Sequence, residues 1–466
     1  MKVLIAAAEV APIIKIGGLG DVIGALPKAL EKISVNADVI VPFFPNAKTD
    51  GLQLFKSFDL HVPFADKSNT VEVFKTKLPN SNVDLYLLKN AEYFVTGGSN
   101  FFANNVTETQ MFAFFNKAVV EYVKYALNTY DVVHCNDWHT GLVTAFLKEE
   151  LGSERPKTLF TIHNLNYQGI GNPTLLKDTG IVPGTHPLID WDLADGDLNM
   201  MQQGITSSDY INTVSPSYAG EILTKEFGVN FDDILKSREG RLSGILNGID
   251  YNSHPVDFSS ENATEGKKQH KKALFEKLKI DPKLESLPIF SFIGRIDAFQ
   301  KGLDILTESV SDIAKKDAVF ILLGTGDKKW EEKLVKVSKD KALSGKFSCN
   351  IMFDIDLANL MYAASDFLVV PSRYEPCGLI QMIAMRYGTL PIVNNVGGLK
   401  DTVENGKTGF VFNRYSSEAL TASMKEALSV YGTPKMQEMI KNAMEKDFSW
   451  TKSAVEYKKL YEKMLS

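Results

Sequence analysis

Short apolar runs rich in β-branched residues alternate with helix-like segments along almost the whole chain. This alternation is typical of βαβ units, in which helices connect parallel strands and cover the sheet. A polar stretch, Ser259–Gln269, interrupts the pattern once, and the alternation then restarts. The expected strands are Val3–Ala7, Asp38–Val41, Val83–Leu88, Asp131–Val133, Thr158–Ile162 and Tyr210–Val214 before the interruption, and Ile289–Ile293, Val319–Leu323, Asn350–Phe353, Phe367–Val370 and Leu390–Val393 after it.

The length of the chain also indicates two folding units. At 466 residues, 44% of them hydrophobic, the chain is too long for one core and suits two domains of roughly 200 residues each. We therefore predict two doubly wound α/β domains, residues 1–244 and 245–446, whose strands end at a common cleft. In the first domain we expect one helix capped by Asp21 and a second over Met111–Leu127.

Composition narrows the range of partners. The formal net charge is −6 and no block of basic residues is present, which argues against nucleic acid or an acidic membrane surface as the main partner. The three cysteines are odd in number and show no Cys-x-x-Cys spacing, which argues against a disulfide framework or a zinc site. No signal peptide and no apolar run of 18 residues is found, so we expect a soluble, cytoplasmic protein.

One short motif occurs twice, once in each half. Gly17, Gly18 and Leu19 form the first copy, and Gly397–Leu399 forms the second; each lies between a strand-like run and a helix-like segment. Paired glycines let backbone N–H groups approach a ligand without interference from Cβ, and the start of a helix favours an anion. The pattern predicts two anion-binding loops, although a Gly-Gly pair is also an ordinary turn between a strand and a helix.

Charged residues follow two of the expected strands in the second half. Arg295 and Lys301 come after the strand that ends at Ile293, and Glu375 comes after the strand that ends at Val370. An arginine can bind phosphate through two parallel hydrogen bonds, and a lysine acts as a point charge. A glutamate in this place can hold sugar hydroxyls or stabilise positive charge on an anomeric carbon. These residues are consistent with a site for a sugar diphosphate.

Polar and aromatic residues follow strands in the first half as well. Asp137 and Trp138 come after one expected strand, and His163, Asn164 and Tyr167 come after the next. Asp, His and Asn side chains suit sugar hydroxyls. The rings of Trp138 and Tyr167 can pack on a pyranose or belong to the core.

Seven segments in this order and spacing resemble bacterial glycogen synthases and plant starch synthases over the whole chain. They are Lys15 with the first Gly-Gly loop, His163–Gly169, Thr213–Pro216, Leu246–Asp250, Gln300–Gly302, the segment around Glu375, and Gly397–Leu399. The resemblance implies a retaining glycosyltransferase with two Rossmann-like domains, the GT-B fold, which extends an α-1,4-glucan from a sugar nucleotide. It also implies that residues 1–244 hold the glucan acceptor, that residues 245–446 hold the donor, and that a C-terminal helix in 447–466 returns to the first domain.

The resemblance assigns roles to individual residues. The implied donor-binding residues are Lys15, Gly17, Gly18, Asn247, Arg295, Lys301, Phe353, Glu375, Cys377, Gly378, Gly397, Gly398 and Leu399. Among them, Arg295 and Lys301 would neutralise the diphosphate, and Phe353 would stack on adenine. The implied acceptor side is Asp137, Trp138, His163, Asn164 and Tyr167. The implied catalytic set is Glu375, Arg295, Lys301, His163, Asp137 and Lys15.

The resemblance also implies a mechanism. Glucose would pass from ADP-glucose to glycogen or a maltooligosaccharide on the front face of the sugar, with the leaving ADP phosphate accepting the proton of the glucan 4-hydroxyl. Enzyme groups would mainly stabilise charge and position the acceptor. No metal or other cofactor is expected, because the two cations replace it. Asp190–Asp192 and Asp354–Asp356 match the Asp-x-Asp motif of metal-dependent transferases, but we expect no metal at either.

Several residues depart from the family pattern. Ile16 and Val396 stand where hydroxyl-bearing side chains are common, and Ile383 stands where related retaining transferases often carry a second glutamate. Five residues instead of four separate Arg295 from Lys301, so this loop must bulge if both cations reach phosphate. These departures leave open the choice between ADP-glucose and UDP-glucose, the strength of catalysis and the preferred acceptor length. The sequence does not give the oligomeric state.

Three other interpretations come from different classes of protein. A dinucleotide-dependent oxidoreductase would need Gly-x-Gly-x-x-Gly directly after the first strand, but Glu9–Lys15 intervene. A sugar-nucleotide epimerase shares the two-domain fold but does not require the segments around His163 and Glu375. A glucan-binding protein without catalysis would explain the departures at Ile16 and Val396.

Overall fold

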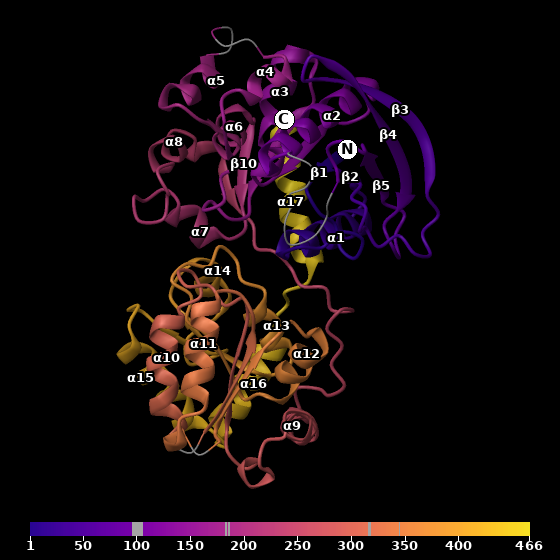
Figure 1. Cartoon of the computed structure of the whole chain (residues 1–466). Helices are drawn as coiled ribbons and strands as arrows, with labels where there is room; N and C mark the ends of the chain where they lie inside the picture. Colours follow the sequence, from indigo (N-terminus) through magenta and orange to yellow (C-terminus); the bar gives the residue numbers. More distant parts are fainter. Residues whose placement is uncertain (96–105, 182–183, 185–186, 316–317, 344) are drawn as a thin grey trace. The chain divides into compact units, whose positions relative to one another are not determined.

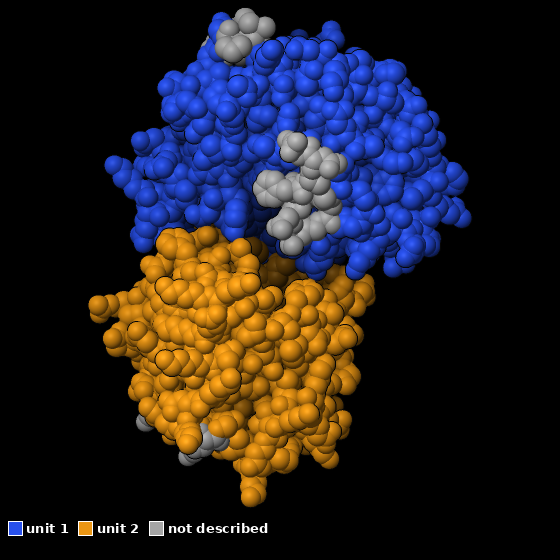
Figure 2. Space-filling model, in the orientation of Figure 1, with its two compact units in different colours: residues 1–214, 219–248, 450–466 blue, residues 215–218, 249–449 orange. Residues whose placement is uncertain are grey.

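The computed structural model describes residues 1–95, 106–181, 184, 187–315, 318–343 and 345–466. They form two compact units, coloured separately in Figure 2. Unit 1 comprises residues 1–214, 219–248 and 450–466, and unit 2 comprises residues 215–218 and 249–449. Within these described ranges, no helix has both the length and the apolar character needed to cross a bilayer.

Unit 1 is built on a nine-stranded sheet with the order β11-β10-β7-β6-β1-β2-β5-β4-β3 (Figure 1). Its strands are β1 Lys2–Ala6, β2 Asn36–Pro42, β3 Phe55–Phe64, β4 Lys67–Lys77, β5 Asp84–Lys89, β6 Val132–Asn136, β7 Lys157–Ile162, β10 Tyr210–Thr213 and β11 Leu242–Gly244. Neighbours from β11 to β5 are parallel, whereas β4 pairs antiparallel with β5 and β3 with β4. A separate antiparallel pair is formed by β8 Ile170–Gly171 and β9 Leu198–Asn199.

Helices cover this sheet. They are α1 Gly18–Lys32, α2 Glu108–Tyr125, α3 Gly141–Leu151, α4 Leu175–Thr179, α5 Pro187–Asp192, α6 Met200–Ser207, α7 Pro216–Glu221, α8 Asp232–Ser237 and α17 Trp450–Leu465. The expectation that Asp21 caps the first helix is wrong. The helix starts four residues earlier, with Gly17 as its N-cap, and Asp21 lies in the first turn, where a negative charge suits the helix dipole.

The order of the strands reverses between β1 and β6. From β1 the chain moves to β2 and on to the edge strand β3, comes back through β4 and β5, and then crosses to β6 on the other side of β1, from which it continues to β7, β10 and β11. The loops that follow β1 and β6 therefore leave the sheet in opposite directions, and α/β sheets commonly bind ligands between such loops. The first Gly-Gly loop follows β1, and Asp137 follows β6 directly.

The C-terminal helix α17, yellow in Figure 1, belongs to unit 1 and packs on α1. His134 of β6 is within hydrogen-bond distance of the Tyr461 hydroxyl, at 2.8 Å, and of Thr161 Oγ1, at 2.7 Å. Asn212 of β10 donates to the Tyr457 hydroxyl at 3.1 Å. Tyr457 and Tyr461 are one turn apart and lie on the same face of the helix. Their hydroxyls are therefore the contacts of this face with the buried polar side chains of the sheet.

Unit 2 contains a six-stranded, fully parallel sheet with the order β14-β13-β12-β15-β16-β17. Its strands are β12 Ile289–Ile293, β13 Val319–Gly324, β14 Phe347–Ile351, β15 Phe367–Val370, β16 Leu390–Asn394 and β17 Phe410–Phe412. Its helices are α9 Ala263–Leu278, α10 Leu303–Ala314, α11 Lys328–Ser338, α12 Ile355–Ala364, α13 Ile380–Arg386, α14 Gly397–Thr402, α15 Ser417–Val430 and α16 Pro434–Met444. The order reverses between β12 and β15, so the loops after these two strands leave the sheet in opposite directions, the place where such sheets commonly bind ligands.

Two doubly wound α/β units confirm the expected fold class, with local corrections. The antiparallel strands β3 and β4 and the short edge strand β17 were not expected. Strand β14 lies earlier than predicted and ends at Ile351, so Phe353 follows it. The polar stretch Ser259–Gln269 is not wholly a linker. Helix α9 begins inside it. Lys267 is buried, and its ammonium donates hydrogen bonds to the carbonyls of Ala363 and Tyr387, which replace its contacts with water.

Candidate active site

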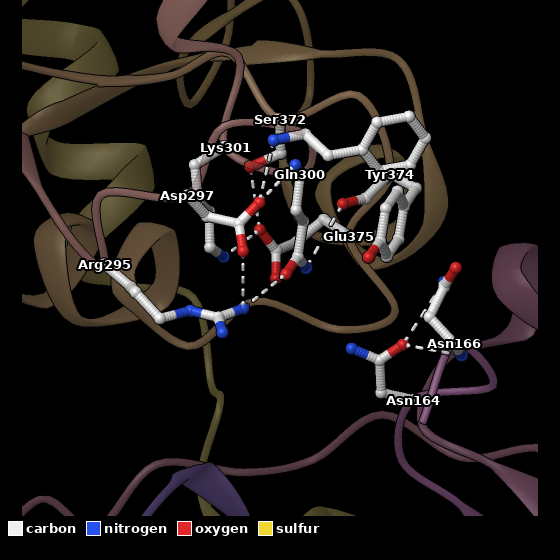
Figure 3. Close-up of polar contacts among 10 residues, drawn as sticks. Asn164, Asn166, Arg295, Asp297, Gln300, Lys301, Ser372, Tyr374 and Glu375 are labelled. Atoms are coloured by element: carbon white, nitrogen blue, oxygen red, sulfur yellow. Dashed lines mark hydrogen bonds and ion pairs between the residues drawn. The ribbon is translucent and has the colours of Figure 1, made fainter. Parts of the chain in front are cut away.

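The cluster at the reversal point of unit 2 centres on an ion pair. Lys301, in the loop after β12, lies with Nζ 2.7 Å from Oε2 of Glu375, in the loop after β15 (Figure 3). The Ser372 hydroxyl donates to the same carboxylate oxygen at 2.8 Å. Glu375 is only 6% exposed. A carboxylate removed from water needs a cation and hydrogen-bond donors, and Lys301 and Ser372 supply them.

The loop between Arg295 and Lys301 bulges at Phe299. Oδ1 of Asp297 accepts the N–H groups of Phe299 at 2.9 Å and Gln300 at 2.6 Å, which closes a tight turn and leaves Phe299 62% exposed. Arg295 Nη2 lies 3.2 Å from Asp297 Oδ2 and donates to Gln300 Oε1 at 3.1 Å (Figure 3). The extra residue is thus absorbed in the turn, and both cations stay at the end of the sheet.

The second Gly-Gly loop packs against the Glu375 segment. The N–H of Gly398 donates to the carbonyl of Glu375 at 3.0 Å. A Cβ on Gly398 would lie 2.1 Å from the carbonyl oxygen of Cys377, so no other residue fits without moving the backbone. Gly378 has φ +71°, a conformation that also favours glycine. Val396 is the N-cap of α14, and its side chain has no atom that could accept a hydrogen bond from the N–H groups of the first turn.

The other expected donor residue of unit 2, Phe353, lies between β14 and α12 and is 85% exposed. It makes none of the hydrogen-bonded contacts of the Lys301–Glu375 cluster. The adjacent Asp354 caps α12 by accepting the N–H of Leu357 at 2.8 Å. This half of the Asp-x-Asp pattern therefore has a structural role.

The second Asp-x-Asp pattern is structural as well. Asp192 is buried, and its carboxylate accepts hydrogen bonds from the side chains of Gln202 at 2.9 Å and Gln203 at 2.8 Å and from the N–H of Asn199 at 3.1 Å. Across the part of the chain that the structure describes, no three or more His, Cys, Asp or Glu side chains are grouped as metal ligands would be.

In unit 1, Asp137 joins the ends of β6 and β7. It has φ +62°, which is uncommon for a residue with a side chain, and its Oδ1 accepts the N–H groups of His163 at 3.2 Å and Asn164 at 3.5 Å. Burial raises the pKa of Asp137 to about 7, and the two backbone N–H groups only partly oppose this shift. The carboxylate fixes the turn that carries His163 and Asn164.

The hydrogen bonds of Asn136 fix the tautomer of His163. Asn136 Nδ2 donates to the carbonyls of Ala6 and His134, both at 3.2 Å, so its Oδ1 faces His163 Nε2 at 3.0 Å as an acceptor. Burial lowers the pKa of His163 to about 3. His163 is therefore neutral at physiological pH, with its proton on Nε2 and a lone pair on Nδ1.

The two aromatic residues proposed for the acceptor side differ in exposure. Trp138 is 6% exposed, and its ring packs against Phe112 and His139. A Cβ on Gly169 would lie 2.1 Å from the Trp138 ring, so the backbone covers the indole closely. Of the two roles considered for Trp138, core packing is the one observed. Tyr167 is exposed.

The first Gly-Gly loop contains a residue that the sequence did not single out. Glu9 is buried, and its carboxylate accepts hydrogen bonds from the backbone N–H groups of Ile16 and Gly17. Lys15 pairs with Asp21 at 2.7 Å on the surface of the loop. In the sequence, the one feature that could have identified Glu9 is that it is a single acidic residue within an otherwise apolar N-terminal stretch.

The expected site residues fall into two groups. Lys15, Gly17, Gly18, Asp137, Trp138, His163, Asn164, Tyr167 and Asn247 lie in unit 1, and Arg295, Lys301, Phe353, Glu375, Cys377, Gly378, Gly397, Gly398 and Leu399 lie in unit 2. Asn247 is buried, and its Oδ1 has no hydrogen-bond partner among the described residues.

The raised pKa of Asp137 predicts a pH-dependent stability. Between about pH 4 and pH 7 the folded state holds a proton that the unfolded state releases, so the free energy of unfolding falls as pH rises through this window. Asp137→Asn removes the titrating group and tolerates the positive φ. At pH 8 we expect the variant to unfold with a free energy about 4 kcal/mol above that of the wild type, and at pH 4 we expect no such gain.

Urea unfolding of both proteins from pH 4 to pH 8 measures this difference. Burial also raises the pKa of Asp192 to about 6 and that of Glu149 to about 7, but both groups titrate in both proteins and cancel in the difference. A difference that does not change with pH would contradict the protonation of Asp137.

Comparisons with known proteins show the family of the chain. Residues 2–237 match the starch synthase catalytic domain, and residues 275–446 match glycosyl transferases group 1. Glycogen synthases from Thermosipho melanesiensis and Streptococcus sanguinis are 41% and 40% identical; each alignment spans 100% of this chain, with 99% and 100% of the relatives covered. The catalytic domain of starch synthase IV from Arabidopsis thaliana, solved with ADP and acarbose, is 27% identical with a TM-score of 0.89, and the match covers 100% of this chain and 99% of that chain. The chain therefore belongs to the glycogen synthase and starch synthase family of retaining glycosyltransferases.

Proposed function

We propose that this protein transfers glucose from ADP-glucose to the non-reducing end of an α-1,4-glucan, with retention of the α configuration. The observation that carries the proposal is the buried pair of Lys301 and Glu375 at the reversal point of the unit 2 sheet. Crevices at such points are where α/β sheets bind nucleotides and sugars. ADP in the related starch synthase IV supports an adenine nucleotide as the donor.

The cations of unit 2 would hold the donor diphosphate. Arg295 and Lys301 lie in one short loop, and each is already paired with a carboxylate, Asp297 and Glu375 respectively. A bound diphosphate would contact these two cations while they remain paired with their carboxylates, so the net charge of the group would be negative. The N–H groups at the start of α14 would then also have to stabilise the diphosphate. The ionised carboxylate of Glu375 can only accept hydrogen bonds, and it would accept one from a glucose hydroxyl.

The transfer itself needs no enzyme nucleophile. The bond between the anomeric carbon and the phosphate oxygen breaks, the glucan 4-oxygen bonds to the same carbon and face, and its proton passes to the departing ADP. Lys301 and Arg295 would stabilise the growing negative charge of the diphosphate. His163 is neutral, so we propose that its Nδ1 lone pair orients a sugar hydroxyl and that the residue supplies no charge.

The donor and the metal requirement are tested together. Labelled glucose is offered as ADP-glucose or UDP-glucose to glycogen, with and without a chelator. We expect kcat/KM for ADP-glucose to exceed that for UDP-glucose about tenfold or more. If the site hydrogen-bonds adenine, uracil in its place would leave polar groups of the protein without partners. We expect the chelator to have no effect, because Arg295 and Lys301 provide the positive charge.

Other outcomes would identify a different protein. Activity that collapses on chelation would overturn the metal-free mechanism. Glycogen binding without ADP release from any donor would indicate a glucan-binding protein, and an isomerised sugar formed from the donor alone would indicate an epimerase.

A further inference from the structure

Glu9 lies in the loop after β1, at the reversal point of the unit 1 sheet. Its side chain is 5% exposed, and Oε2 accepts the N–H of Gly17 at 2.9 Å as well as that of Ile16. A Cβ on Gly20 would lie 3.1 Å from the same oxygen, so the start of α1 closes directly over the carboxylate. This buried acid has no part in the mechanism described above.

The Glu9 carboxylate occupies backbone donors that a ligand was expected to use. Paired glycines before a helix suit an external anion, but here the anion on Ile16 and Gly17 is part of the chain. Further backbone hydrogen bonds hold the rest of the loop, among them those from Ala11 N–H to the Gly20 carbonyl at 2.9 Å and from Val10 N–H to the Ile14 carbonyl at 2.8 Å. The loop therefore has a defined shape without any ligand.

The charges of the loop give the same conclusion. Lys15 and Gly18 are exposed, whereas Glu9 is enclosed beneath them. Lys15 pairs with Asp21, so the loop with Glu9 ionised contains one more negative than positive charge. A diphosphate that displaced Glu9 would have to leave this carboxylate buried without donors, at a large cost in free energy. Lys15 is the group that a donor can reach without that cost.

We propose that Glu9 is a positioning residue of the first Gly-Gly loop: its carboxylate is a built-in anion that braces the backbone of Ile16 and Gly17, so that Lys15, and not these two N–H groups, is left to bind a nucleoside diphosphate. This inference rests on the proposed function, because it takes the donor to be a nucleoside diphosphate sugar. A competing arrangement, in which the diphosphate displaces Glu9, predicts the opposite change in affinity when the carboxylate is removed.

The test compares Glu9→Gln with the wild type, using ADP as the ligand in calorimetry. The amide turns an NH2 group toward the loop and keeps one acceptor oxygen, so the brace loses a charge-assisted hydrogen bond. We expect Kd for ADP and KM for the sugar nucleotide to rise about tenfold, with KM for glycogen unchanged and kcat reduced less than KM is raised. Tighter binding of ADP by the variant, or unchanged binding, would overturn the proposal.

A matched control separates positioning from stability. Asp209 is also a carboxylate of unit 1 that accepts a backbone N–H, from Thr158 at 2.8 Å, and it pairs with Arg155 at the start of β7 and β10. Asp209→Asn is expected to lower Tm and leave Kd for ADP at the wild-type value. An equal rise in Kd in both variants would show that the effect of Glu9 is only one of stability.

Hydrogen exchange on the wild type provides a readout that needs no variant. The brace predicts that the amides of Ile16 and Gly17 are protected before ADP is added and that ADP leaves their exchange unchanged. Protection that appears only with ADP would overturn the proposal. If the wild type transfers no glucose to glycogen from any donor, the proposed function fails; if it does transfer glucose and Glu9→Gln behaves identically, only the inference about Glu9 fails.

Discussion

Lys301→Ala is expected to lower kcat/KM for glucose transfer to glycogen about 10³-fold. Lys301 provides positive charge at the leaving diphosphate, where charge grows most in the transition state. It also holds Glu375, whose Oε2 lies 2.7 Å from its ammonium. Glu375→Ala is expected to abolish transfer as well, because it removes the acceptor for the sugar hydroxyl and frees Lys301 to move. Both effects are measured with labelled ADP-glucose.

The stability of the two variants should differ. Lys301→Ala removes the ammonium partner of the buried Glu375 carboxylate and leaves it hydrogen-bonded by the Ser372 hydroxyl, which costs about 3 kcal/mol or more. Adding Glu375→Gln removes this charge, so the double variant should regain most of the lost Tm and none of the activity. That pattern separates the catalytic role of the pair from its structural role.

An exposed ion pair of the same unit serves as the control. Lys435 and Glu438 lie 3.2 Å apart on α16, and exposed pairs contribute little to stability. Lys435→Ala should therefore change neither Tm nor kcat/KM. Transfer at the wild-type rate by Lys301→Ala or Glu375→Ala would refute the assigned roles.

Where the sequence predicted the site well, the reason is local. Strands β12 and β15 coincide with the expected Ile289–Ile293 and Phe367–Val370, because each is a fully buried, mainly apolar run that is followed by a polar turn. Parallel neighbours end at the same edge, so Lys301 and Glu375 were expected to lie close together once their strands were assigned. The ion pair then follows from burial.

Features that depend on contacts distant in sequence could not be predicted. The hydrogen bonds of Glu9 exist only because its loop folds back on itself, and nothing in the local pattern shows this closure. The tautomer of His163 depends on Asn136, whose amide is oriented by carbonyls of two strands. Lys267 lies in a charged stretch that reads as a linker, yet the carbonyls of Ala363 and Tyr387, far along the chain, make it part of the core.

The twin Gly-Gly motifs also look equivalent in sequence and are not equivalent in structure. In the second copy, Gly398 lies against the backbone of Cys377, and close approach to protein explains the glycine. In the first copy, a Cβ on Gly18 would meet no atom within 4 Å, so the fold leaves room there. The difference comes from the neighbouring loop, the Glu375 segment, which exists only beside the second copy in unit 2.

Gly398→Ala is accordingly expected to be among the most damaging single changes in the chain. The added Cβ would lie 2.1 Å from the Cys377 carbonyl oxygen and 2.5 Å from its Cα, and backbone atoms cannot rotate away as a side chain can. Relief requires a shift of α14 or of the Glu375 segment, so we expect a loss of about 3 kcal/mol in the free energy of unfolding and about 10²-fold in kcat/KM, since small displacements of catalytic groups are costly. Gly18→Ala should leave Tm unchanged, and calorimetry together with transfer kinetics measures both variants. A Gly398→Ala protein with the Tm and kcat/KM of the wild type would mean that the Glu375 segment moves freely, and the buried pair with Lys301 would then not define the donor site.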